Sequence, residues 1–199
     1  MAYEQTADNL IATLGVWDEL LTGRRTIRLI ACGGTALTLL GYKEATKDVD
    51  FLVPDLTEYK RLTSFLREAG YEAMGGYKWG RKGEWTEYDL FPGKTVFMTE
   101  LLSSPLEKGG HRIIKRFKKL DLGVLNSIDL MITKLARGSE ADYQDCLTLL
   151  KNENIDWKQF EERYKEAAKY SINYGIEEEK AMKRSAYLKQ LFREKGDKQ

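Results

Sequence analysis

Cysteine and histidine are scarce in this chain, and their scarcity excludes several kinds of protein. The two cysteines, Cys32 and Cys146, stand alone in apolar surroundings, so they form neither a disulfide framework nor a metal-ligand spacing. The only histidine, His111, lies beside Gly109 and Gly110, and we interpret it as a loop residue rather than a catalyst. The sequence therefore predicts a protein of a reducing compartment.

A strong net charge and a long apolar run are also missing. The formal net charge is +1, so the whole chain has no general attraction to nucleic acid or membrane, and a polyanion would have to be met locally. The first ten residues contain no basic region followed by an apolar one, and the most apolar stretch, residues 28–40, is interrupted by Cys-Gly-Gly-Thr. We expect a cytoplasmic protein that does not span a membrane.

The distribution of strand and helix signals predicts an α+β (mixed α/β) protein. Strands are predicted at residues 28–32, 48–53, 71–74, 77–81 and 84–91, with helices at 8–22, 35–40 and 57–69. Beyond about residue 98 only a weak strand signal remains, at 120–125, and helices are predicted from Asn126 to Gly138, from Ser139 to Leu150 and from Trp157 to Ser171. We expect a small mixed sheet flanked by helices in residues 1–105 and a mainly helical region in residues 106–199.

The segment from Cys32 to Val53 has the residues most suited to chemistry. Gly33 and Gly34 permit a positive φ and a close approach of the backbone to a ligand, and the first free N–H groups of the next helix, near Thr35, would face that ligand. A triphosphate is the anion that such a turn suits.

Two acids follow the glycine turn on a predicted strand. Because strand side chains alternate between faces, Asp48 and Asp50 should point to the same side, about 6.6–7 Å apart along the strand. Carboxylates this close repel each other unless a cation lies between them, and Mg²⁺ or Mn²⁺ with a bound nucleotide would satisfy them. A two-metal site needs a third carboxylate on a neighbouring strand; Asp89 is the candidate, with Glu87 as the alternative.

This pattern resembles the DNA polymerase beta-type nucleotidyltransferase superfamily, whose signature is a Gly-Gly or Gly-Ser turn at a helix start, Asp-x-Asp on the next strand and a third acid on a later strand. The residues Gly33 to Leu37, Gly41, Thr46 and Asp48 to Phe51 most resemble the branch of abortive-infection (AbiEii-type) toxins and their uncharacterised prokaryotic relatives. The resemblance covers about residues 28–150. It implies a nucleotidyltransferase fold in which Asp48, Asp50 and Asp89 bind metal ions and nucleoside triphosphate (NTP).

A second, looser similarity lies downstream. The toxin-like branch has a lysine on a helix, then an arginine, then an Asp-x-x-Asp pair, and this sequence offers Lys134, Arg137, Asp142 and Asp145. By resemblance, Lys134 would contact the phosphates and Asp145 or Asp142 would orient groups at the site. Read without the resemblance, these four residues are charges at helical spacing, which is typical of an exposed helix face.

The basic stretch from His111 to Lys119 has two interpretations. It contains five lysines or arginines, enough to contact the backbone of RNA or DNA. The apolar residues Ile113, Ile114 and Phe117 equally fit an amphipathic helix packed on one side, and we favour that solvated helix. Cys32 is interpreted as a buried, inert thiol.

The function expected from the sequence is the Mg²⁺-dependent transfer of a nucleoside monophosphate from an NTP such as ATP to a hydroxyl group. The acceptor is left open between RNA such as transfer RNA, a protein, and a small molecule of the antibiotic type, with a slight preference for a macromolecule. Alternatives are an inactive nucleotidyltransferase fold that serves as a binding or regulatory module and a Mn²⁺-dependent glycosyltransferase. A toxin–antitoxin-like partner protein or a homo-oligomer is compatible with the resemblance.

Overall fold

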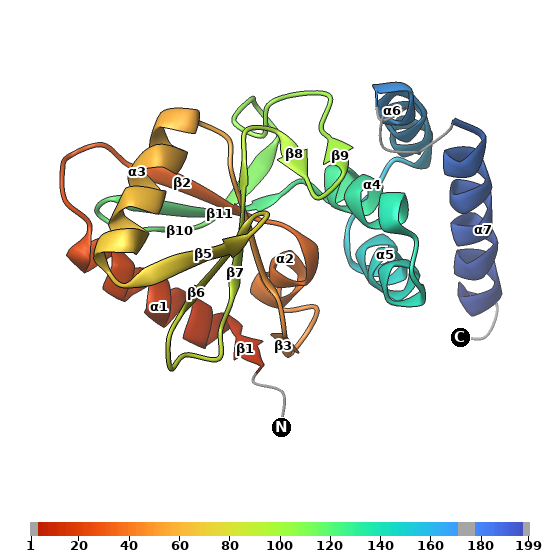
Figure 1. Cartoon of the computed structure of the whole chain (residues 1–199). Coiled ribbons are helices and arrows are strands. Elements are labelled where there is room, and N and C mark those ends of the chain that lie inside the picture. The colour runs from red at the N-terminus through yellow and green to blue at the C-terminus, as the bar shows by residue number, and fades with distance from the viewer. Residues whose placement is uncertain (1–3, 171–177, 197–199) are drawn as a thin grey trace. The chain divides into compact units, whose positions relative to one another are not determined.

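The computed structural model describes residues 4–170 and 178–196 (Figure 1). The chain divides into two compact units that are not separated by one cut in the sequence. The first unit lies within residues 1–94 and 103–125, and the second within residues 95–102 and 126–199. The chain therefore leaves the first unit, returns to it, and leaves it again.

The first unit is built on a mixed sheet with the strand order β10-β11-β2-β4-β7-β6-β5. The strands, in chain order, are β2 (Ile27–Ala31), β4 (Val49–Val53), β5 (Tyr71–Gly75), β6 (Lys78–Arg81), β7 (Tyr88–Pro92), β10 (His111–Arg116) and β11 (Leu120–Leu125). Strand β2 is antiparallel to β4, and β4 is parallel to β7. The C-terminal end of β2 therefore lies beside the N-terminal ends of β4 and β7, at one end of these three neighbouring strands.

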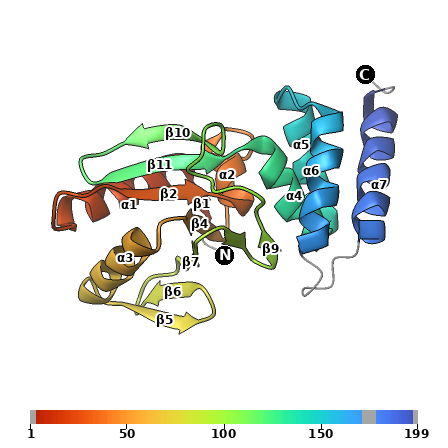
Figure 2. The same ribbon diagram turned by 90° about the horizontal axis from the view of Figure 1, so that it is seen from above.

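Three helices accompany this sheet: α1 (Ala7–Leu20), α2 (Gly33–Leu39) and α3 (Leu56–Glu68). Trp17 of α1 is buried, and its ring packs against those of Phe65 on α3, Tyr71 on β5 and Tyr88 on β7. Burying such aromatic surface is worth several kcal/mol to the first unit, at about 25 cal/mol per Å². Figure 2 shows β10, β11 and β2 lying side by side in this unit.

A short strand pair completes the edge near the glycine turn. Strand β1 (Gln5–Thr6) is antiparallel to β3 (Ala45–Thr46), with Gln5 opposite Thr46. Gln5 Nε2 also donates to Thr86 Oγ1 at 2.6 Å, just before β7. The beginning of the described chain is thus tied to the segments that precede β4 and β7.

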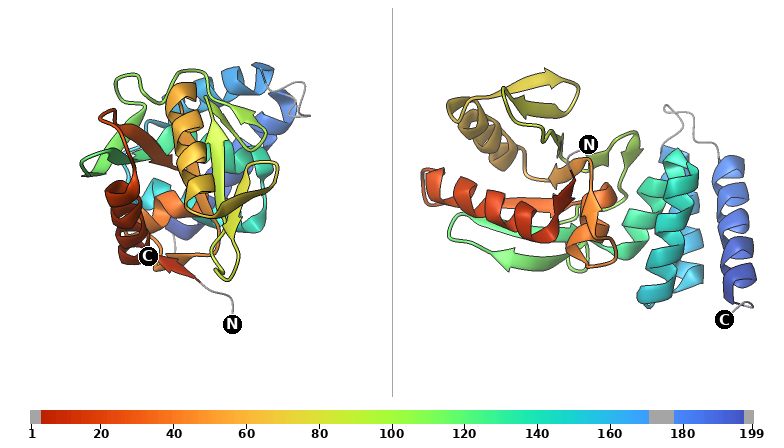
Figure 3. Two further views of the ribbon diagram at one scale, coloured as in Figure 1. Left: turned by 60° about the vertical axis from the view of Figure 1, so that its left-hand side comes forward. Right: turned by 90° about the horizontal axis from the view of Figure 1, so that it is seen from below.

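The second unit consists of a hairpin and helices. Its elements are β8 (Thr95–Val96), β9 (Thr99–Glu100), α4 (Ser127–Arg137), α5 (Glu140–Asn152), α6 (Trp157–Tyr170) and α7 (Glu178–Gly196), and Figure 3 shows these helices packed beside one another. Buried Phe160 and Tyr164 of α6 stack, with ring centroids 5.7 Å apart. In residues 4–170 and 178–196, no helix is both long and apolar enough to cross a bilayer.

Helix ends in the second unit follow the sequence signals. Asn126 caps α4 by accepting from the N–H of Asp129, and Gly138 ends that helix with φ +70°. Ser139 and Asp142 form a reciprocal capping box at the start of α5. The predictions at these positions are confirmed, whereas the predicted end of the last of these helices, Ser171, lies outside the described residues.

The prediction of a helix at residues 111–119 was wrong. Residues 111–116 form strand β10, which pairs with β11 and places this edge of the sheet in the first unit. His111, expected in a loop, is the first residue of β10. The alternation of apolar and charged residues is broken by a bulge between Ile113 and Lys115, so the stretch does not show the simple period of a strand.

Candidate active site

The glycine turn at the end of β2 is pressed against Asp50. Gly33 opens α2 with φ +57°, a left-handed conformation that favours glycine. A Cβ atom added at Gly33 would lie 2.0 Å from Asp50 Oδ2, so a larger residue could not occupy the position without moving that carboxylate. A Cβ added at Gly34 would lie 2.7 Å from Thr46 Oγ1. Both glycines are therefore required by close approach to the neighbouring segment.

Thr35 connects α2 with the acidic segment. Its buried hydroxyl donates to the carbonyl oxygen of Asp48 at 3.1 Å and accepts from the N–H of Asp50 at 2.9 Å. The hydroxyl of Thr46 donates to the same Asp48 carbonyl at 2.8 Å. These hydrogen bonds fix the backbone on both sides of Val49, so the two aspartates are held by their main chain.

The strand register brings the predicted acids together. Asp50 of β4 is the direct partner of Asp89 of β7 in their parallel pairing. Adjacent strands lie about 4.8 Å apart, and directly opposed residues share a face. Asp48 precedes β4, where its side chain is exposed, whereas Asp50 is only 3% exposed and Asp89 is half-buried. The three residues thus lie at the same end of the neighbouring strands β4 and β7 and differ in their exposure to solvent. We call this group of acids the acidic edge.

Lys78 is a member of this charged group that the sequence reasoning missed. It lies opposite Asp89 in the antiparallel pairing of β6 and β7, and its Nζ is 2.7 Å from Glu87 Oε2. The hydrogen bond to Glu87 is the main cause that raises the pKa of Lys78, and the charges of Asp89 and Asp48 add to it. Its position beside Trp79 in a short strand gave no signal, because only the cross-strand register identifies its neighbours.

The carboxyl group of Asp89 responds to the same charges. Burial is the main reason that the pKa of Asp89 is raised; Lys78 acts against this shift, while the negative charges of Asp48 and Glu87 increase it. Asp48 and Asp89 therefore lie close enough to repel each other. A cation between them would relieve that repulsion.

The donor chemistry suits a hard divalent cation such as Mg²⁺, which prefers oxygen ligands. Within the described residues, however, no group of three Asp, Glu, His or Cys side chains is already arranged to hold a metal ion. The carboxylate of Asp50 is directed at Gly33, and Lys78 already supplies a positive charge near Asp89. The carboxylates are thus of the chemical type that such an ion prefers, and the negative charge of Asp48 acts on the carboxyl group of Asp89.

The downstream candidates form ion pairs inside the second unit. Lys134 Nζ lies 2.6 Å from Asp145 Oδ2, and the side chains are only 1% and 8% exposed. Arg137 Nη2 lies 2.6 Å from Asp142 Oδ1, and its guanidinium covers the ring of Phe97 at 4.7 Å. The structure thus brings Lys134 together with Asp145, and Arg137 with Asp142, and each pair joins α4 to α5.

Comparison with known proteins supports a single family. A family model described as "Nucleotidyltransferase of unknown function (DUF6036)" matches residues 8–192. No curated protein matches the sequence.

Two solved structures show a distant likeness. One is from H. pylori and is described as a nucleotidyltransferase; it is 12% identical, with 99% of each chain covered and a TM-score of 0.46. The other is the nucleotidyltransferase toxin MenT4 from Mycobacterium tuberculosis H37Rv, which is 19% identical, with 81% of this chain and 65% of that chain covered and a TM-score of 0.42.

Proposed function

Because this chain belongs to the nucleotidyltransferase family whose model spans residues 8–192, we propose that it transfers a nucleoside monophosphate from an NTP to a hydroxyl acceptor, with Asp48, Asp50 and Asp89 at the reaction centre. The observation that supports this most is the register of β4 and β7, which makes Asp50 and Asp89 direct partners beside the glycine turn. Sheets rarely place like charges opposite each other, because such pairs are destabilising. A site that binds a cation and an anionic substrate would account for this pair of opposed carboxylates.

In the proposed reaction, the acceptor hydroxyl attacks the α-phosphorus in line, a new O–P bond forms, and the bond to the β-phosphate oxygen breaks so that pyrophosphate leaves. Divalent cations held by Asp48, Asp50 and Asp89 would neutralise the phosphate charge. Asp89 would accept the hydroxyl proton, since its half-buried carboxyl group has a raised pKa. Gly33 and Gly34 would let the backbone approach the triphosphate, and Thr35 would hold the acidic segment in place.

Lys78 adds a role that the sequence did not predict. Its ammonium group lies among Glu87, Asp89 and Asp48, where it lowers their mutual repulsion. We propose that this charge keeps the acidic edge stable before metal and NTP bind. The triphosphate would then approach carboxylates whose negative charge is partly balanced by Lys78.

The acceptor is proposed to be a hydroxyl of RNA, with a protein or a small molecule as alternatives, and ATP is the first donor to test. Mg²⁺ or Mn²⁺ is the proposed cofactor and a cytoplasmic location the proposed setting, since NTPs are available there. A partner protein of the antitoxin kind is compatible with the family assignment. A retained fold without catalysis would bind NTP independently of Mg²⁺ or not at all.

The test is a labelling assay with each α-³²P-NTP, Mg²⁺ or Mn²⁺, and separate RNA, protein and small-molecule pools. Parent protein should label one pool, and Asp50→Asn and Asp89→Asn should each lose on the order of 100-fold or more of that labelling, as loss of a charge-stabilising group does in other enzymes. Glu87→Gln is the matched control on the same strand edge and should keep most activity. Equal labelling by parent and Asp89→Asn would contradict the assignment.

A further inference from the structure

Five exposed cationic side chains gather at the end of the sheet remote from the glycine turn. They are Arg24 and Arg25, in the loop before β2, and Lys115, Arg116 and Lys118, at the end of β10 and in the turn that follows. We call this group the basic end. The net charge of the chain is only +1, so such a local excess is not a consequence of composition.

Strand pairing places the two segments of the basic end next to each other. Strand β11 runs parallel to β2, with Leu120 opposite Ile27, and the N–H of Ile27 donates to the carbonyl of Lys119 at 2.8 Å. Arg116 is opposite Asp121 in the β10–β11 pairing. Since Gly33 follows the other end of β2, the basic end and the candidate active site lie at opposite ends of that strand.

A buried carboxylate fixes the turn that carries Lys118. Asp18 of α1 is 4% exposed and accepts from the backbone N–H groups of Lys118 at 3.2 Å, Lys119 at 2.6 Å and Leu120 at 2.8 Å. The ammonium of Lys119 turns inward to the carbonyls of Asp18 and Leu21. The turn is therefore held through its main chain and Lys119, and the side chain of Lys118 remains at the surface.

The neighbouring loop is fixed in the same manner. The guanidinium of Arg61 on α3 donates to the carbonyl of Thr22 at 2.8 Å and to the carbonyl of Arg25. This anchors the backbone of the loop and leaves the side chains of Arg24 and Arg25 exposed. Both loops are thus fixed by side chains that do not belong to the basic end. This lowers the conformational-entropy cost of ordering the loops when a partner binds.

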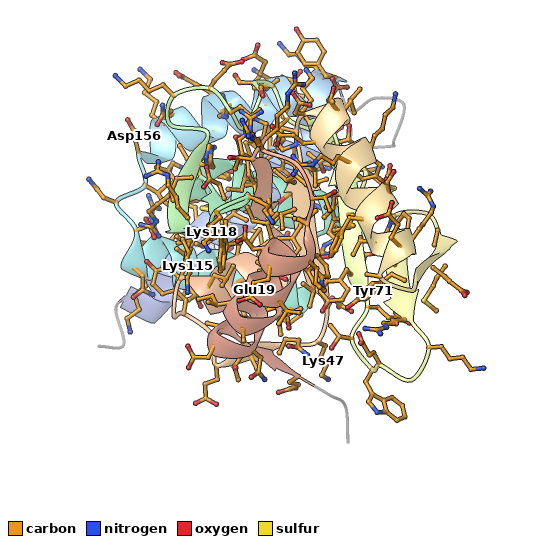
Figure 4. All side chains as sticks on the ribbon, turned by 90° about the vertical axis from the view of Figure 1, so that its left-hand side faces the viewer. Glu19, Lys47, Tyr71, Lys115, Lys118 and Asp156 are labelled. Carbon is orange, nitrogen blue, oxygen red and sulfur yellow. The ribbon has the colours of Figure 1, made fainter. Side chains whose placement is uncertain are left out.

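The positive charges of the basic end are not neutralised within the described part of the chain, where no carboxylate lies within ion-pair distance of these five side chains. The acids Glu58 and Asp55 are occupied by Arg28. Figure 4 faces this side of the first unit and labels Lys115 and Lys118, together with exposed Glu19 of α1. Glu19, Asp121 opposite Arg116 and the buried Asp18 are acids of this end of the sheet, and they are fewer than the five cations.

We infer that the basic end binds the phosphate backbone of a nucleic acid. Nucleic-acid interfaces are polar and strongly positive, whereas the centre of a protein–protein interface is more apolar and depleted in charged residues. Phe117 is the aromatic residue here, and it is partly covered by the ammonium of Lys115, 5.0 Å from its ring centroid. The exposed apolar residues Val16 and Leu20 of α1 belong to a different groove, lined also by Trp85 and Tyr88. This inference goes beyond the proposed transfer reaction and does not depend on it.

The test measures fluorescence anisotropy of a labelled single-stranded RNA, and of DNA with the same sequence, with the full-length protein at several salt concentrations. With five phosphates contacted, the logarithm of affinity should fall with a slope of about −3.5 against the logarithm of salt concentration, or roughly 100-fold between 50 and 200 mM. The double variant Arg24→Glu/Lys118→Glu should weaken binding at least about tenfold and flatten that slope. Preference for RNA, or equal binding of RNA and DNA, would each support backbone recognition.

The matched control is Lys158→Glu/Lys183→Glu, which makes the same change of net charge at exposed lysines of the second unit. It should leave RNA affinity within about twofold of the parent. An equal loss in the control, unchanged binding in the basic-end variant, or tighter binding of a polyglutamate peptide than of RNA would each overturn the inference. RNA affinity is measured without NTP or metal ion, so a failure of the proposed catalysis is distinguishable from a failure of this site.

Discussion

Asp50 and Asp89 are direct partners in the parallel pairing of β4 and β7, although a helix and two strands separate them along the chain. Like charges opposite each other destabilise a sheet by a few tenths of a kcal/mol to about 1 kcal/mol. Here Lys78 opposes Asp89 from the other neighbouring strand and offsets part of that cost. The edge is thus a balanced group of charges that a divalent cation and a triphosphate would rearrange.

Gly33→Ala should harm both stability and the proposed activity. The substitution imposes a left-handed φ on alanine, which costs about 1–2 kcal/mol, and its Cβ would displace the carboxylate of Asp50. Gly41→Ala is the matched control, because Gly41 also has a positive φ, +76°, but nothing lies within 4 Å of an added Cβ. Thermal unfolding and label transfer should show a larger loss for Gly33→Ala; equal losses would mean that the contact with Asp50 is unimportant.

Lys78→Met should increase the affinity of the acidic edge for Mg²⁺ while preserving the strand. The ammonium of Lys78 repels a cation near Asp89, and its removal also frees the charge of Glu87. Charges a few ångströms apart near a surface interact by about 1 kcal/mol or more, so a gain of roughly tenfold is expected. Titration calorimetry with Mg²⁺ measures it, with Lys82→Met as a control at an exposed lysine of the same region. Weaker Mg²⁺ binding by Lys78→Met would show that the lysine orders the acids instead of competing with the ion.

Local sequence signals predicted the glycine turn, the acidic strand and the helix caps. Gly33, Asn126, Gly138 and Ser139 act through the backbone within a few residues of themselves, so their effects are readable from the sequence. The parallel pairing of Asp50 with Asp89 was predicted only as a neighbouring-strand relation, and the structure gives its register. Expectation and structure agree where the interaction is short-range.

The sequence could not reveal relations that depend on long-range pairing. Strand β10 was predicted as a helix because its partner β11 and the bulge between Ile113 and Lys115 are set by the sheet. Lys78 becomes part of the acidic group only through its register with Asp89. The burial of Lys134 with Asp145 likewise depends on the packing of α4 against α5, so helical spacing alone suggested exposed charges.

The buried pair of Lys134 and Asp145 should act mainly on stability. Removing one partner of a buried ion pair costs about 3–5 kcal/mol, because the other charge remains in an apolar setting. Lys134→Met alone should therefore lower the free energy of unfolding strongly, whereas Lys134→Met/Asp145→Leu should recover a large part of the loss. Urea unfolding of the parent, both single variants and the double variant gives the coupling energy.

The same variants test the role that the resemblance assigns to Lys134. If the lysine stays with Asp145, the double variant should bind NTP with nearly parental affinity once it is folded. A loss of NTP affinity of tenfold or more in the folded double variant, on the order of 1.4 kcal/mol, would instead support a contact between Lys134 and the phosphates. Arg163→Met, which breaks a pair with Asp129 in the same unit, controls for general weakening of the helices.

Asp142 should make the stability of the protein depend on pH in the acidic range. Burial alone would raise the pKa of Asp142, but hydrogen bonds from Arg137 and Ser139 hold it below its ordinary value. The ionised form is thus favoured by folding, so its contribution is present at neutral pH and is lost as pH falls below about 4, through the pKa of the folded state. Asp142→Asn should be less stable than the parent at pH 7, and the difference should shrink as the pH is lowered toward about 3. Thermal unfolding across this range measures the difference, and Glu140→Gln, at an exposed acid on the first turn of α5, should show no comparable narrowing because the Arg137 pair remains intact.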